Sequence, residues 1–351
     1  MRFGVSRVLD AIEARLSTDP LLARAVLDLA EIVRLVDLDG DTGKPATLLR
    51  LGHVIDALGR HLGEDGAAVY VVAPRALLSD LDLTSNERMV VRRWADDGRV
   101  EVLTEPRDRV PELAAMLAVP LISRQAPTRF AGEYPWLPGA TLAPGMHGLG
   151  APPGGVRTPS ASTAVWLTRL WRCSEPDCVG FAAPGGAQPP PRVRAGVPTC
   201  PRHDTRLADV GPRPAARVLA ARVDGTVRMR FVVREGSPVV VGRSPGEGVA
   251  LGPWLGEEAM RWISRSHLRL ELRGDALVVV DTSTNGTVAR TRGGSLRLPP
   301  GQAYGIGADD VLELHQGVEI AAPNKFRGSA AEVESVMAEA PTVAMRLRGP
   351  R

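Results

Sequence analysis

The last third of the chain consists of short, β-branched or alternating apolar segments, each bounded by Gly, Pro, Asp or Asn. Such segments predict strands, and short strands at regular spacing are typical of a β-sandwich. Six strands are expected, at residues 227–233, 238–242, 267–273, 276–280, 295–298 and 311–315. A helix-prone insertion from Trp254 to Trp262 interrupts the series. This part of the chain is therefore expected to be all-β.

Three polar motifs fall between these strands: Gly242-Arg243, Ser264-Arg265-Ser266-His267 and Asp281-Thr282-Ser283-Thr284-Asn285-Gly286-Thr287. An arginine fork and hydroxyl groups match phosphate oxygens, and an Asn-Gly step makes a tight turn. Taken alone, each motif is an ordinary polar turn. Their order and spacing closely resemble the forkhead-associated (FHA) family of phosphothreonine-peptide readers, over residues 217–322. The resemblance implies a β-sandwich with ligand-binding loops at one end.

The resemblance also implies roles for individual residues. Arg243 and Ser264 would contact the phosphate, Arg265 and Thr284 would contribute nearby, and Asn285 would bond the peptide backbone. Four further residues would brace the loops: Gly242, His267, Asp281 and Gly286. The implied partners are a threonine-phosphorylated protein and the Ser/Thr kinase that phosphorylates it.

All three cysteines of the chain lie close together. Cys173 and Cys178 form a Cys-x4-Cys pair, and Cys200 and His203 form a Cys-x2-His pair. An odd number of clustered cysteines does not suit a disulfide framework, whereas three thiolates and an imidazole form a closed set suited to structural zinc. The arrangement resembles a small zinc ribbon over residues 165–216. Incidental cysteines without a metal are the alternative.

The N-terminal third alternates apolar strands with helical patterns, which predicts a parallel sheet with helices on its faces. Strands are expected at residues 31–38, 67–73, 99–103 and 119–123, and helices at 45–62, 84–97 and 110–117. This domain should cover residues 1–137, and the Pro/Gly-rich residues 138–164 should form a flexible connector. Ligands of such sheets bind beyond the carboxyl ends of the strands.

The N-terminal order of motifs resembles the NYN branch of the PIN-like ribonucleases over about residues 30–137. The motifs are Asp37-Leu38-Asp39-Gly40-Asp41, Val72-Ala73-Pro74-Arg75, the 109–117 helix, Pro120-Leu121-Ile122-Ser123-Arg124 and Tyr134-Pro135-Trp136-Leu137. Such nucleases gather carboxylates around a divalent metal. By resemblance Asp39 and Asp41 would be the first acids, and Asp108 or Glu112 the second.

The family places an acid after its serine, where this chain has Ser123-Arg124-Gln125. Because an arginine there would oppose a cation, the sequence favours a non-catalytic or altered PIN-like domain over an active one. A Rossmann-like scaffold unrelated to nucleases, with solvated aspartates in a loop, is the alternative.

The length of 351 residues indicates two or three domains. The net charge is +3 and the pI about 9.0, but only Lys44 and Lys325 among the 43 basic residues are lysine. This arginine bias is typical of a GC-rich genome, and so small a net charge argues little for nucleic-acid binding. The sequence has no apolar run of about 18 residues, and its amphipathic N-terminus contains Asp10 and Glu13. A cytoplasmic protein without a membrane partner is expected.

Two functions follow from these observations. The first is a signalling adaptor that docks on phosphothreonine through its FHA domain, with residues 323–351 as a tail. In that tail a helical run is expected at 329–340, and Thr342 is a possible phosphorylation site that could reach the chain's own pocket. The second is a metal-dependent RNase that its FHA domain directs to a phosphorylated protein, and for which nucleic acid would be a partner. The incomplete set of acids favours the first.

Overall fold

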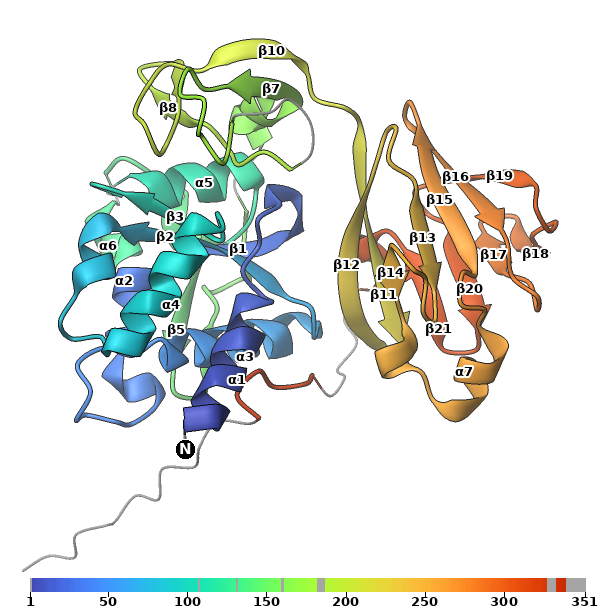
Figure 1. Cartoon of the computed structure of the whole chain (residues 1–351), viewed down its shortest axis with the longest axis horizontal. Coiled ribbons are helices and arrows are strands. Elements are labelled where there is room, and N and C mark those ends of the chain that lie inside the picture. The colour runs from blue at the N-terminus through green and yellow to red at the C-terminus, as the bar shows by residue number, and fades with distance from the viewer. Residues whose placement is uncertain are drawn as a thin grey trace, which may run out of the picture.

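The computed structural model of the chain describes residues 2–106, 108–130, 132–158, 161–181, 187–326 and 333–338. Figure 1 shows three parts: an N-terminal α/β domain, a small module above it, and a β-sandwich beside both. Among the described residues, no helix is long and apolar enough to cross a membrane.

The α/β domain is built on one six-stranded sheet in the order β3-β2-β1-β4-β5-β6. All neighbouring strands are parallel except β5 and β6. The strands are β1 (Ala23–Asp28), β2 (Ala68–Pro74), β3 (Val100–Leu103), β4 (Leu121–Ile122), β5 (Thr141–Gly145) and β6 (Gly148–Gly150). The helices are α1 (Arg2–Glu13), α2 (Leu29–Ile32), α3 (Leu49–Leu62), α4 (Ser85–Asp96), α5 (Arg109–Leu117) and α6 (Ala126–Arg129). The expected parallel sheet with helices is confirmed.

Both faces of this sheet are buried. Alternate strand residues point to opposite faces, so they belong to two different cores. Ala25, Leu27, Val69 and Val71 belong to one core with the apolar residues of α1, α3 and α4. Val26, Tyr70 and Val72 belong to a second core with those of α5. The strands therefore have continuous apolar runs, as buried parallel strands do.

The ends of the helices follow from local sequence. Thr84 and Glu87 form a capping box at the start of α4, in which each side chain bonds the backbone N–H of the other residue. Glu87 also accepts from Thr47 Oγ1 at 2.7 Å and from Leu48 N at 2.8 Å, which ties α4 to the start of α3. Helix α3 ends at Leu62 and is capped by Gly63, whose φ of 67° is in the left-handed region that glycine adopts easily.

Two predictions for this domain were wrong. Residues 31–38 form part of α2 and a 3-10 turn (Val36–Leu38), and the first strand is β1, earlier in the chain. Residues 138–164, expected as a flexible connector, include β5 and β6, and β5 pairs with β4 inside the sheet. The reason is tertiary: β5 is short and contains Pro144, so only its neighbours in the sheet make it a strand.

The middle module consists of two small antiparallel pairs. One joins β7 (Arg169–Arg172) to β10 (Ala208–Pro212), and the other joins β8 (Arg192–Arg194) to β9 (Val197–Thr199). Cys173 follows β7 directly, and Cys200 follows β9 directly. This part is called the Cys/His module below.

The C-terminal part is a two-sheet β-sandwich, as expected. One sheet has the order β12-β11-β21-β20-β17-β18, and the other β14-β13-β15-β16-β19. The strands are β11 (Ala216–Val223), β12 (Thr226–Arg234), β13 (Val239–Gly242), β14 (Val249–Ala250), β15 (Leu268–Arg273), β16 (Ala276–Asp281), β17 (Val288–Thr291), β18 (Gly294–Arg297), β19 (Ala303–Ile306), β20 (Val311–His315) and β21 (Val318–Ala321). Helix α7 (Glu257–Trp262) forms within the predicted helix-prone insertion.

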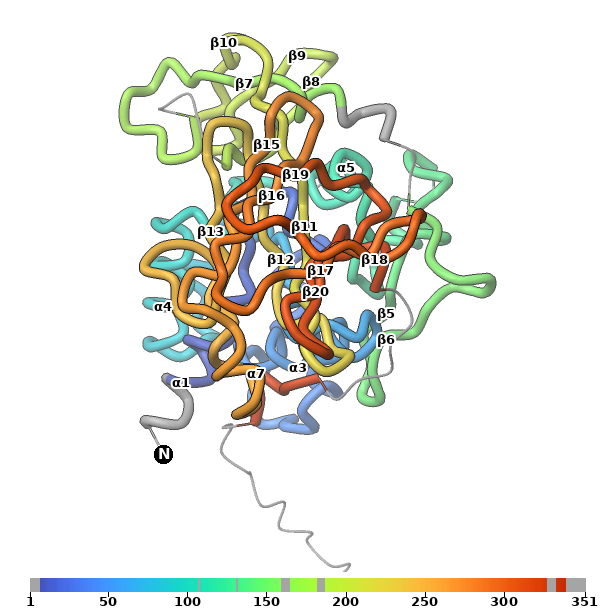
Figure 2. The backbone as a smooth tube through the Cα atoms, turned by 90° about the vertical axis from the view of Figure 1, so that its right-hand side faces the viewer, coloured from blue at the N-terminus to red at the C-terminus, as the bar shows by residue number. Residues whose placement is uncertain are grey.

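Buried ion pairs hold the sandwich against the α/β domain, in front of which it lies in Figure 2. Glu64 accepts from Arg24 of the same domain and from Arg230 of β12, at 3.0 and 2.6 Å. Asp65 pairs with Arg228 of β12, and its backbone N–H donates to Val227 O at 2.9 Å. Because Glu64 and Asp65 are only 5 % exposed, both carboxylates are largely removed from water.

Residues 333–338 return from the sandwich to the α/β domain and lie along α3. Asp56 of α3 accepts from Ser335 Oγ and from Val336 N, the latter at 2.7 Å, and Val336 joins the N-terminal core. These residues form a turn without helix, unlike the expected helical run at 329–340. Thr342 lies outside the described residues.

Candidate functional site

The pairing of β13, β15 and β16 brings the three polar motifs to one edge of their sheet. Val241 pairs with Leu268, and Leu268 pairs with Asp281. The loops after β13, before β15 and after β16 therefore emerge side by side. In Figure 1 they lie with α7 at the end of the sandwich opposite the Cys/His module.

Gly242 permits the first two loops to cross. A Cβ atom at Gly242 would lie 2.1 Å from the carbonyl oxygen of Arg265, so any other residue would force the backbones apart. The crossing is held by bonds from Arg243 N to Ser264 O at 3.0 Å and from Ser244 N to Arg265 O at 3.2 Å. Arg243 is thereby fixed next to Ser264.

His267 supports Ser264 from inside the sandwich. The ring is fully buried, and its Nδ1 accepts from Ser264 N at 3.2 Å. Burial lowers the pKa of His267, against the opposing effect of the Asp281 carboxylate. A neutral ring whose Nδ1 accepts carries its proton on Nε2. Ser264 Oγ in turn accepts from Thr284 N at 3.1 Å, which joins the second and third loops.

Asp281 and Gly286 shape the third loop. The buried Asp281 carboxylate accepts from Ser283 N at 2.9 Å and Thr287 N at 2.8 Å. Gly286 has a φ of +88°, and a Cβ atom there would lie 2.7 Å from the Arg297 guanidinium. These contacts are consistent with the bracing roles expected for Gly242, His267, Asp281 and Gly286.

The five residues expected to bind a phosphopeptide line this loop cluster. Arg265 and Thr284 are exposed, and Ser264, Arg243 and Asn285 are half-buried. Arg243 Nη1 donates to Met260 O at 2.6 Å, and Asn285 Nδ2 donates to Trp262 O at 2.8 Å. Each side chain keeps further donors free, because a guanidinium has five N–H groups and an amide two. The cluster can therefore present several donors to an anion.

Comparison with known proteins identifies this part of the chain. A family model of the FHA domain matches residues 239–314, so this chain contains an FHA domain. No curated protein matches the chain.

Solved FHA domains also match. The MEK1 FHA domain is 23% identical over 30% of this chain and 86% of its own length, with a TM-score of 0.25. The FhaA FHA domain, solved with the intracellular domain of Rv3910, is 25% identical over 30% of this chain and 98% of its own, with a TM-score of 0.23. The FHA domain of an Arabidopsis thaliana hypothetical protein is 26% identical over 31% of this chain and 83% of its own length, with a TM-score of 0.25.

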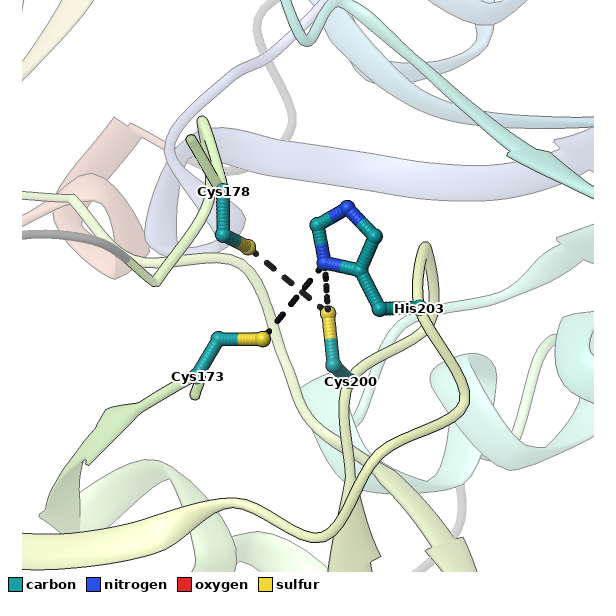
Figure 3. Close-up of side chains that lie close together, drawn as sticks. All are labelled: Cys173, Cys178, Cys200 and His203. Atoms are coloured by element: carbon teal, nitrogen blue, oxygen red, sulfur yellow. Dashed lines mark hydrogen bonds between the residues drawn. The ribbon is translucent and has the colours of Figure 1, made fainter. Parts of the chain in front are cut away.

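The four ligand candidates of the Cys/His module converge. Figure 3 shows the three sulfur atoms and His203 Nδ1 turned toward one another, and their ligand atoms all lie within 4.8 Å of one another. Cys178 Sγ is 3.7 Å from Cys200 Sγ, and His203 Nδ1 is 3.6 Å from Cys200 Sγ and 3.4 Å from Cys173 Sγ. A tetrahedral zinc with bonds of about 2.3 Å to sulfur and about 2.1 Å to nitrogen requires spacings of about 3.5–3.8 Å. These three spacings lie close to that range, and the four residues could hold a metal ion such as zinc.

The cysteines differ in their surroundings. Burial raises the pKa of Cys200 to about 12, and the neighbouring Cys178 and Cys173 add to the effect. Burial also acts to raise the pKa of Cys173, but hydrogen bonds from Thr205 and from the backbone of Glu175 bring it down to about 7. Three thiols packed together cannot all ionise unless a cation compensates their charge.

The acids expected for a nuclease are not gathered. Asp39 accepts from Arg50 Nε at 3.1 Å, and Asp41 pairs with Lys44 at 3.0 Å, both in the loop between α2 and α3. Asp108 precedes α5, and Glu112 of α5 pairs with Arg109 at 2.9 Å. Within the described residues, the Cys/His set alone brings three or more potential metal ligands together. Because the first strand ends at Asp28, Asp39 and Asp41 do not lie at the carboxyl end of a strand.

Other polar residues occupy the carboxyl ends of β1 and β4. Asp28 ends β1, Glu31 follows in α2, and Ser123 follows β4; all three line a cavity of about 300 Å³. The chain reverses its strand order between β1 and β4, which is where open α/β sheets place ligands. Ser123 Oγ donates to Glu31 Oε2 at 2.7 Å, and burial, together with Glu31, raises the pKa of Asp28.

The sequence contained a signal for this site that the strand assignment missed. Asp28 accepts from Ala30 N at 2.9 Å as the N-cap of α2. An aspartate with this role divides the apolar run into a strand and a helix.

Proposed function

We propose that this protein is a phosphothreonine-dependent adaptor that binds threonine-phosphorylated partner proteins through its FHA domain. The observation that carries the proposal is the loop cluster, in which Arg243, Ser264 and Thr284 present donors side by side. A dianionic phosphate with three acceptor oxygens suits such a set. The proposal also requires a Ser/Thr kinase that phosphorylates the partner protein.

The docked domains give the adaptor a fixed geometry. The ion pairs of Glu64 and Asp65 with β12 attach the sandwich to the α/β domain. A partner bound at the loop cluster is thereby held at a defined position relative to the α/β domain and the Cys/His module.

We further propose that Cys173, Cys178, Cys200 and His203 hold one structural zinc, which leaves no ligand position open for catalysis.

Arg243→Ala is expected to weaken binding of a phosphothreonine peptide about 10- to 150-fold, because a charge-assisted bond is worth about 1.5–3 kcal/mol. Fluorescence anisotropy with matched phosphorylated and unphosphorylated peptides measures the effect. Arg273→Ala is the control, because Arg273 is exposed at the end of β15 that lies away from the loops. Equal binding of both peptides by the unaltered chain would refute the adaptor.

The alternative, a metal-dependent RNase, has less support because its expected acids are dispersed. We expect no cleavage of single-stranded RNA by the purified chain with Mg²⁺ or Mn²⁺, measured on denaturing gels. Metal-dependent cleavage that Asp28→Asn abolishes and Asp39→Asn leaves intact would establish the nuclease at the cavity between β1 and β4.

A further inference from the structure

Helix α7 is bonded to two of the side chains expected to bind the peptide. The last carbonyl groups of a helix have no partner within the helix. In α7, Met260 O accepts from Arg243 and Trp262 O accepts from Asn285. The helix therefore holds both side chains in place before any ligand arrives, which lowers the entropy cost of binding.

The outer surface of α7 carries an unusual exposed aromatic side chain. Trp262 is 44% exposed, and its ring centroid lies 5.8 Å from that of His315 at the end of β20. Glu258 Oε1 is 3.7 Å from His315 Nε2, and the Glu258 side chain is 90% exposed. Glu257, also almost fully exposed, precedes it. Trp262, Glu258 and Glu257 are called the α7 shelf below.

The backbone of the α7 shelf is bonded to a residue expected to bind the peptide. Asn285, expected to bond the peptide backbone, donates to the carbonyl of Trp262 itself. The indole is thus attached to the residue that Asn285 holds. Trp262 is therefore the exposed aromatic residue whose backbone is bonded to the expected peptide contact.

We propose that the α7 shelf selects an arginine or lysine that flanks the phosphothreonine; this inference rests on the proposed function. An indole face attracts a cation through its ring electrons. The exposed carboxylate of Glu258, four residues before Trp262 and so on the same face of the helix, complements the same charge. Arg261 pairs with Glu257 at 3.3 Å but is itself 82% exposed, so the pair is open to exchange. The occupant is therefore a basic phosphothreonine peptide.

Phosphothreonine peptides in an alanine background, with arginine placed in turn at each of four positions on either side, test the proposal on the full chain. Arginine at one position is expected to tighten binding about 3- to 10-fold over alanine, and glutamate there to weaken it. Trp262→Ala should abolish the arginine preference, and Glu258→Gln should reduce it. Glu235→Gln, the same charge change on an exposed residue at the far end of the sandwich, should leave it intact.

The outcomes separate this inference from the proposed function. A chain that binds phosphorylated and plain peptides alike refutes the adaptor. A chain that requires the phosphate but shows no arginine preference, or keeps the same preference in Trp262→Ala, refutes the α7 shelf alone. Retained discrimination between phosphorylated and plain peptides by Trp262→Ala shows that the variant is folded. A preference for apolar residues that Glu258→Gln leaves unchanged refutes the selection of a cation.

Discussion

Cys200→Ser is expected to release the zinc and to unfold the Cys/His module, while the α/β and FHA domains stay folded. The core of the module consists of Trp171, Phe181, Leu207 and the three cysteines, with Trp166 packed against them. Half of this core consists of the proposed metal ligands, so the proposed zinc would supply most of the folding free energy. Structural zinc sites contribute about 10–16 kcal/mol of apparent binding free energy at pH 7.

Zinc content by plasma mass spectrometry measures the first effect, with one zinc per chain expected for the unaltered protein and almost none for the variant. Amide hydrogen exchange measures the second and should rise in β7 to β10. His203→Gln should act in the same direction, whereas His147→Gln, at an exposed turn, should change neither quantity. A chain purified without chelators that carries no zinc would contradict the structural metal site.

The features predicted well from sequence depend on local chemistry. Gly242 and Gly286 occupy positions that exclude a Cβ atom, and these tight positions keep the FHA motifs recognisable. The Cys/His spacing was predictable because the chain has no other cysteines. In both cases a few residues suffice to define the chemistry.

The features predicted poorly depend on tertiary contacts. The apolar run around β1 fits a strand or a helix equally well. If the run is divided into a strand and a helix at Asp28, the acid expected at the carboxyl end of the first strand is Asp28 instead of Asp39. Strand β5 exists only through its pairing with β4. The pairs of Glu64 and Asp65 with β12 join residues more than 160 positions apart, and sequence spacing gives no indication of them.

The role of Arg109 also depends on tertiary contacts that sequence spacing does not indicate. Arg109 joins the α/β domain to the Cys/His module. Its side chain is fully buried and donates to Glu101 at 2.6 and 3.1 Å and to Glu112 at 2.9 Å. It also donates to the carbonyl groups of Pro190 and Pro191 in the module, at 2.7 and 2.9 Å. Burial lowers the pKa of Arg109, but Glu101 and Glu112 outweigh burial and raise it, so the guanidinium stays charged.

Arg109→Ala is therefore expected to cost about 3–5 kcal/mol of unfolding free energy, because it leaves two carboxylates without their buried counter-charge. Chemical denaturation followed by circular dichroism measures the loss. Arg92→Ala, on an exposed part of α4, should cost less than about 0.5 kcal/mol. Adding Glu101→Gln to Arg109→Ala should recover part of the loss, because one uncompensated charge is then removed. If instead the two changes add, the loss comes from packing and from the bonds to Pro190 and Pro191, and hydrogen exchange should then rise chiefly in the Cys/His module.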